Sequence, residues 1–150
     1  MSGATWDFSA PLGGAPAAAT VAVDYKALKR QATALAQQQD HVQAATLNER
    51  AADAAKAAGD AEVARAGYSS HAGCLFALGQ WEQALAASDK AVEADMRHWA
   101  GWANRGAALH RQGRYDDEAQ TYQKALDRKP PAAGQLQTIC ENLQLARDEW

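Results

Sequence analysis

Two stretches of this chain have almost the same pattern: LGQWEQALAASDKAVEAD at residues 78–95 and QGRYDDEAQTYQKALDRKP at residues 112–130. Each has a glycine, an aromatic residue two positions later, and an alanine-rich amphipathic run that includes Lys-Ala. Pairs of equivalent residues in and before these stretches are all 34 positions apart: Gly79 and Gly113, Trp81 and Tyr115, Ala91 and Ala125, Leu75 and Leu109, Tyr68 and Trp102. A unit of 34 residues therefore occurs at least twice.

The pattern from residue 23 onward predicts helices throughout. β-Branched residues are scarce and no apolar–polar alternation persists, which argues against strands. Asp24, Asp40 and Asp60 are suited to cap the first three helices, because a carboxylate accepts hydrogen bonds from the free N–H groups of a first turn. Asp95 is expected to cap the turn before the fifth helix. The seven expected helices cover about 25–38, 41–58, 61–78, 81–94, 97–111, 115–128 and 133–150.

Small residues recur where paired helices must approach closely, and bulky residues recur where space between the units must be filled. This pattern resembles the tetratricopeptide repeat, a helix–turn–helix unit of 34 residues in which the glycine permits the tight turn. The signature positions hold Tyr68, Ala72, Leu75, Gly79, Trp81, Ala84 and Ala91 in one copy, and Trp102, Gly106, Leu109, Gly113, Tyr115, Tyr122, Ala125 and Pro130 in the next. Glu118 departs from the family pattern, because a small residue usually stands there.

A degenerate copy precedes these two. Gln39 takes the place of its turn glycine, 40 positions before Gly79, and the six additional residues are expected to lengthen its second helix. The last helix resembles the solvating cap that repeat arrays need. The resemblance implies an all-α helical-hairpin array, or α-solenoid, over residues 23–150, following an N-terminal low-complexity tail at 1–22. Its expected parts are a degenerate repeat at 25–58, repeats at 65–98 and 99–132, and a capping helix at 133–150.

Composition excludes several classes of function. The chain has 150 residues and a net charge of -3, which gives no electrostatic reason to bind nucleic acid. No apolar run approaches the roughly 20 residues of a spanning helix, so membrane insertion is not expected. The first 20 residues have no basic start and no apolar run, so they are not expected to act as a secretory signal. A cytoplasmic location is expected, with an organelle or cytoskeletal assembly left open, and Cys74 and Cys140 are expected to be reduced and mostly buried.

The sequence contains no recognisable motif for catalysis, metal binding or phosphate binding. The four histidines form no HExxH motif and no Cys/His pattern with zinc spacing. PLGGAP at residues 11–16 lacks the Gly-Lys-Ser/Thr of a phosphate-binding loop, and no local Ser/His/Asp motif occurs. We therefore predict a protein that is not an enzyme, with no catalytic residues, no metal site and no cofactor.

The family resemblance implies a concave groove lined by the first helix of each repeat. Such a groove binds a helix or an extended peptide of a partner protein. The positions that line it are basic at one end and small in the middle. They are Lys26, Lys29, Arg30, Thr33, Ser69, Ser70, Gly73, Phe76, Ala103, Asn104, His110 and Arg111.

Two roles follow from this resemblance. The first is a small structural or scaffold subunit of a larger protein assembly. The alternative is a co-chaperone adaptor that clamps the C-terminal carboxylate of a chaperone with Lys, Arg and Asn side chains of the groove. This sequence retains Lys29 but has Thr33 at the next clamp position, followed by Ser70, Ala100 and Asn104. The clamp is not expected to form, because an alanine cannot donate the charge-assisted hydrogen bonds that hold a carboxylate.

Trp6 and Phe8 are unusual in a tail rich in Gly, Ala, Pro and Ser. In an extended segment, residues two positions apart point to the same side. These two aromatics are expected to anchor the tail, either on a partner subunit or on the protein's own domain. A leader whose aromatics have no role remains the alternative.

Overall fold

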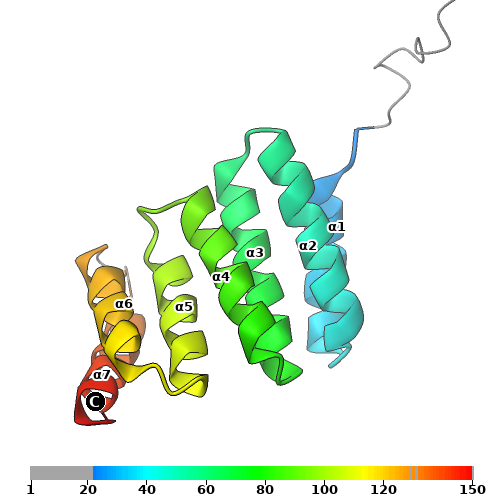
Figure 1. Cartoon of the computed structure of the whole chain (residues 1–150). Helices are drawn as coiled ribbons and strands as arrows, with labels where there is room; N and C mark the ends of the chain where they lie inside the picture. Colours follow the sequence, from blue (N-terminus) through cyan, green and yellow to red (C-terminus); the bar gives the residue numbers. More distant parts are fainter. Residues whose placement is uncertain (1–21, 129, 131, 150) are drawn as a thin grey trace, which may run out of the picture.

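The computed structural model describes residues 22–128, 130 and 132–149. Seven α-helices and no strands occur among these residues (Figure 1). Three helical hairpins, α1–α2, α3–α4 and α5–α6, follow one another, and α7 packs against α6. The helices are α1 (Tyr25–Gln37), α2 (His41–Ala57), α3 (Ala61–Ala77), α4 (Trp81–Ala94), α5 (Trp99–Arg111), α6 (Tyr115–Asp127) and α7 (Ala133–Glu149). The predicted all-α array of hairpins is confirmed.

The three predicted aspartate caps are confirmed. Asp24, Asp40 and Asp60 each accept a hydrogen bond from the backbone N–H three residues later, over 3.0, 3.2 and 3.2 Å. The fifth helix begins two residues later than predicted. Asp95 caps the preceding turn by accepting from the Arg97 N–H over 3.0 Å, and His98 then caps α5 itself.

The turns between helices have a common backbone geometry. Gly59, Gly79 and Gly113 all have a positive φ, between 71° and 78°, which glycine adopts without a steric cost. Gln39 has a φ of 66°, and it is the one non-glycine residue in the described segments with a positive φ. Its hydrogen bonds match those of the Gly79 turn, since the next residue donates to Leu35 O over 2.9 Å just as Gln80 donates to Leu75 O. The first hairpin therefore makes the same turn as the later ones, with a residue that is strained in it.

We expect Gln39→Gly to stabilise the protein by about 0.5–1 kcal/mol. Glycine relieves the left-handed strain at this turn, and that gain exceeds the extra backbone entropy that glycine loses on folding. The free energy of unfolding in urea, followed by far-UV circular dichroism, measures the change. Gln38→Gly is the matched control, because Gln38 has an ordinary φ of -85° and glycine there should destabilise. Equal shifts for the two variants would contradict the strain.

The six additional residues of the first repeat do not lengthen one helix only, so that prediction was wrong. Helices α2 and α3 both have 17 residues, whereas the equivalent pair α4 and α5 have 14 and 13. Three residues therefore extend α2 and four extend α3, and the loop between them is one residue shorter. The two helices grow as a pair because an extra turn on either alone would have no partner to bury it. Alanines along α2 make this long contact possible: Ala44, Ala45, Ala51, Ala52 and Ala55 are all buried.

The core lies between the helices, as the repeat register predicts. The bulky signature residues Tyr68, Leu75, Trp102 and Leu109 are buried, and so are the small residues Ala72, Ala84, Ala91, Gly106 and Ala125. Cys74 is buried, but Cys140 is exposed, which corrects the prediction that both thiols lie inside. The reason is the register of α7. Its buried residues are Ile139, Leu143 and Ala146, so Cys140 points away from the face that packs on α6.

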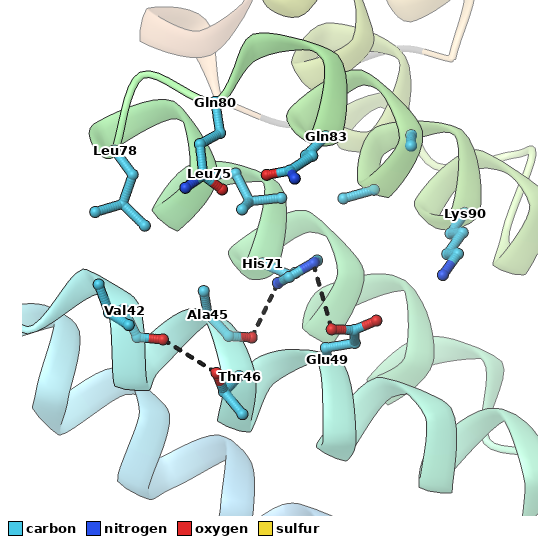
Figure 2. A pocket seen from close by; sticks show the side chains of 12 residues that line it. Val42, Ala45, Thr46, Glu49, His71, Leu75, Leu78, Gln80, Gln83 and Lys90 are labelled. Atoms are coloured by element: carbon cyan, nitrogen blue, oxygen red, sulfur yellow. Dashed lines mark hydrogen bonds and ion pairs between the residues drawn. The ribbon is translucent and has the colours of Figure 1, made fainter.

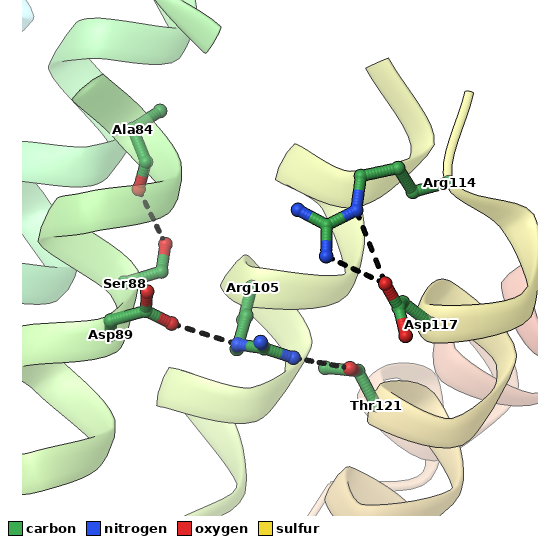
Figure 3. Close-up of polar contacts among 7 residues, drawn as sticks. All are labelled: Ala84, Ser88, Asp89, Arg105, Arg114, Asp117 and Thr121. Carbon is green, nitrogen blue, oxygen red and sulfur yellow. Dashed lines mark hydrogen bonds and ion pairs between the residues drawn. The ribbon is translucent and has the colours of Figure 1, made fainter. Parts of the chain in front are cut away.

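Polar contacts hold α5 between the second helices of two hairpins (Figure 3). The Arg105 guanidinium donates to Asp89 on α4 over 2.7 Å and to the buried Thr121 on α6 over 2.8 Å. Ser88, also buried, donates to the carbonyl of Ala84 within α4. The first helices approach one another more closely than the second helices do, because α3 contacts both α1 and α5 directly, while contacts between α2 and α4 are sparser. The array therefore curves with its first helices on the inside.

Candidate functional site

The inner side of the array carries three hollows, and we call this side the groove. Neighbouring first helices form its walls, and α7 closes one end. The hollow between α1 and α3 has a volume of about 280 Å³, the hollow at α1, α2 and α3 about 250 Å³, and the hollow at α3, α5, α6 and α7 about 200 Å³. We refer to them as the basic, middle and acidic hollows.

The basic hollow brings together three of the predicted groove residues, Lys26, Lys29 and Arg30. Arg65 of α3 adds a fourth cation, and Glu62 is the one acidic side chain that lines the hollow. Sequence reasoning missed Arg65, although its place on a first helix, one turn before Ser69, was a signal. Four cations against one carboxylate make this end of the groove electropositive.

Two of these cations are partly withdrawn from water. The Lys29 ammonium donates to Ser70 Oγ over 2.9 Å, which joins α1 to α3. Burial lowers the pKa of Lys29, and the nearby charge of Arg65 lowers it further. The Arg65 Nε is buried and has no hydrogen-bond partner among the described residues. A buried donor without a hydrogen-bond partner, next to a cluster of cationic side chains, favours an anionic group as ligand.

The middle hollow has small walls. Three predicted residues line it: Thr33, Ser70 and Gly73. A side chain added at Gly73 would meet no atom within 4 Å, so the groove is open at this point. Behind it the Asn48 amide donates to Cys74 Sγ over 3.8 Å. Burial raises the pKa of the Cys74 thiol, so this cysteine stays protonated at neutral pH and is a poor nucleophile.

The acidic hollow contains Phe76, His110 and Arg111 of the predicted set. Its inner wall is Glu118, which is 1% exposed and lies 3.1 Å from His110 Nδ1 through each carboxylate oxygen. Burial raises the pKa of Glu118, and the hydrogen bond from His110 opposes the rise. The sequence marked Glu118 only as a departure from the family pattern.

The other predicted site residues are not gathered in these hollows. Ser69 lies on α3 with a buried hydroxyl that has no partner among the described residues. Ala103 packs against the core cluster that contains Trp102. Asn104 is half-buried on α5 and lines none of the three hollows. Trp6 and Phe8 lie outside the described residues, so their anchoring role stays a prediction.

A fourth hollow, of about 440 Å³, lies on another side of the array, between α2, α3 and α4 (Figure 2). His71 points into it and binds the carbonyl of Ala45 over 2.9 Å, with Glu49 3.8 Å from its other nitrogen. Val42 and Leu78 are exposed apolar residues on its rim. Sequence reasoning did not predict this hollow, because it depends on how three helices, α2, α3 and α4, pack together.

The described segments contain neither a cluster of metal ligands nor a helix suited to cross a membrane. Among these residues no group of His, Cys, Asp and Glu side chains is placed to hold a metal ion. No helix of the described chain combines the length and the apolar character that a membrane crossing requires.

One family model matches part of this chain. Residues 75–133 match the family model described as Tetratricopeptide repeat. Comparison with curated proteins gives no match. Among solved structures, the Sgt2 TPR domain from Aspergillus fumigatus is 19% identical, with a TM-score of 0.70 over 83% of this chain and 78% of that chain.

Two other solved structures have the same fold. The TPR2B-domain:pHsp70 complex of yeast Sti1 is 18% identical, with a TM-score of 0.73 over 84% of this chain and 98% of that chain. The Yersinia enterocolitica type III secretion chaperone SycD, in complex with a peptide of the translocator YopD, is 13% identical, with a TM-score of 0.71 over 83% and 92%. At these identities the likeness establishes the helical-repeat fold.

Proposed function

We propose that this chain, a tetratricopeptide-repeat protein, is a non-enzymatic module that binds an extended or helical segment of a partner protein in its groove. Solved structures of the same fold hold peptides, among them a translocator peptide in SycD and an Hsp70 peptide in Sti1. The role we favour is a small structural subunit of a larger cytoplasmic assembly, with the tail as a second contact. Nothing in this role requires nucleic acid, a membrane or a cofactor.

The basic hollow is the observation that carries the proposal. Lys26, Lys29, Arg30 and Arg65 converge there from two helices, and the Arg65 Nε lacks a partner among the described residues. A partner segment with an acidic side chain would supply acceptors for these donors. The open wall at Gly73 leaves room for the rest of the segment to continue along the groove.

The test is selection from a library of random dodecapeptides, followed by fluorescence polarisation. We expect selected peptides to carry an acidic residue and the double variant Lys26→Glu/Arg30→Glu to bind them at least about tenfold more weakly, a loss near 1.4 kcal/mol, since charge-assisted contacts are reversed. Arg50→Glu/Lys56→Glu is the matched control, because it changes the net charge equally at exposed positions of α2. An equal loss for both double variants would contradict a site in the basic hollow.

The co-chaperone alternative is tested in the same assay. Lys29 lies in the groove, but its ammonium is already bonded to Ser70, and Thr33 offers no charge at the next clamp position. A peptide ending in Glu-Glu-Val-Asp should therefore not bind with micromolar affinity. Micromolar binding that disappears both on amidation of the peptide terminus and in Lys29→Ala would favour the adaptor role over the one proposed.

A further inference from the structure

We propose that the acidic hollow is a specificity pocket for one basic side chain, lysine or arginine, of the segment that binds in the groove, with Glu118 as its counter-ion. The inference rests on the proposed function and adds to it a second recognition element at the other end of the groove. Its starting point is a charged side chain that is buried at the base of an open hollow.

Glu118 is poorly supplied with hydrogen bonds for a buried carboxylate. Two carboxylate oxygens can accept about four hydrogen bonds. Among the residues that the structure describes, His110 Nδ1 is the one side-chain donor to them, and both oxygens share it at 3.1 Å. The position in the first turn of α6 gives partial compensation through the helix dipole. A cation that enters the hollow would supply the missing donors and the opposite charge.

The walls of the hollow suit a long basic side chain. Phe76, Ala107 and Leu145 offer apolar surface for methylene groups, and the Tyr122 hydroxyl and Asn142 amide lie deeper, 3.5 Å apart. A volume of about 200 Å³ corresponds to roughly seven water molecules, so it takes one side chain and excludes a helix. Amphipathic side chains such as lysine place their stems and charges in this way.

The other charges near the hollow are compatible with a bound basic side chain. Arg111 is the fixed cation among the lining residues, and its guanidinium is held 5.1 Å over the Trp81 ring, toward α4. Glu149 of α7 adds a second negative charge, which raises the pKa of Glu118. Arg111 at the rim is suited to a backbone carbonyl or an acidic neighbour of the incoming basic residue.

The two charged hollows would give the bound segment a direction. Arg65 in the basic hollow and Phe76 in the acidic hollow lie eleven residues apart on α3, which is about 16 Å along the helix. An extended segment covers that distance in about five residues. The acidic residue of the partner would then lie near α1, and its basic residue at least about five positions away, near α7.

The dodecapeptide selection also tests this inference, now with Glu118→Gln. We expect peptides selected on the wild type to share a lysine or arginine, and replacement of that residue by norleucine to weaken binding about tenfold. In Glu118→Gln the two peptides should bind equally, since the glutamine carbonyl still accepts from His110 but carries no charge. Asp116→Asn is the matched control, an exposed acid on the same helix, and should keep the tenfold preference.

Other outcomes separate the two proposals. Selected peptides without a basic preference, or a preference that survives Glu118→Gln, would overturn the pocket and leave the groove proposal standing. Failure to select any peptide would overturn both. Should Glu118→Gln not fold, Leu145→Trp serves as a second variant, because Leu145 is exposed on the rim and tryptophan there narrows the hollow. It should weaken the lysine peptide, and unchanged binding would count against the pocket.

Discussion

Replacing Gly67 with leucine is expected to destabilise the protein by about 3 kcal/mol, at the upper end of the usual cost of overpacking. A Cβ atom at Gly67 would lie 2.8 Å from Ala52 Cβ and 3.1 and 3.2 Å from the Ala52 backbone. The backbone of α2 cannot yield as a flexible side chain would, so α2 and α3 must separate along their contact. The free energy of unfolding in urea, followed by far-UV circular dichroism, measures the loss.

Gly73→Leu is the matched control on the same helix. Nothing lies within 4 Å of a Cβ atom built at Gly73, and the residue is exposed on the groove. Leucine has a helix propensity about 1 kcal/mol better than glycine, so this variant should be slightly more stable than the wild type. Similar destabilisation by both substitutions would show that the loss at Gly67 has no connection with the close contact between α2 and α3.

Gly67 is an example of a residue that recurs at the 34-residue spacing without being a signature position. Gly67 and Gly101 are 34 residues apart, and each packs on the preceding second helix, against Ala52 and against Ala91 and Val92 respectively. The pair was readable from the 34-residue offset, yet the family signature does not include it. The helices, caps and turns were predictable because they depend on local sequence. An aspartate before a helix caps it, and a glycine between two helices permits the turn.

Features that depend on contacts between helices were not predictable in the same way. The distribution of six additional residues over α2 and α3 follows from their pairing, which no single helix pattern contains. Cys140 was wrongly predicted to be buried for the same reason. Which face of α7 points inward depends on how α7 packs on its neighbours.

The candidate site also has parts that were predicted from the sequence and parts that were missed. The basic end of the groove was predicted because the family resemblance assigned three residues of one helix, Lys26, Lys29 and Arg30, to the groove wall, and these three line one hollow. Arg65 was missed although its place on a first helix was a signal, whereas the fourth hollow was missed because it depends on the packing of three helices. Glu118 was noticed as a departure from the family pattern, but its burial was not predicted. That burial depends on two other helices, α5 and α7, that pack around it.

Trp102→Ala is expected to cost about 3–5 kcal/mol, because it removes a large side chain from the core of the last repeat. Trp102 is 7% exposed and packs in one cluster with Val92, Tyr122 and Ile139. Its indole N–H donates to the Met96 carbonyl over 3.0 Å, which ties α5 to the loop before it. Cations of α6 and of the residue that follows it, Lys124 and Arg128, lie 4.9 and 4.8 Å from the ring centroid.

The loss should be uneven along the chain, because in a repeat array each unit is stabilised mainly by its neighbours. The cluster around Tyr68 and Ala91 shares no member with the Trp102 cluster. Amide hydrogen exchange should therefore accelerate first in α5, α6 and α7, while α2 and α3 keep their protection. Trp81→Ala is the control, since Trp81 is only half-buried and contacts Phe76 and Arg111 at the surface of the array. A uniform loss of protection in Trp102→Ala would mean that the seven helices unfold as one cooperative unit, and that the groove cannot open at one end alone.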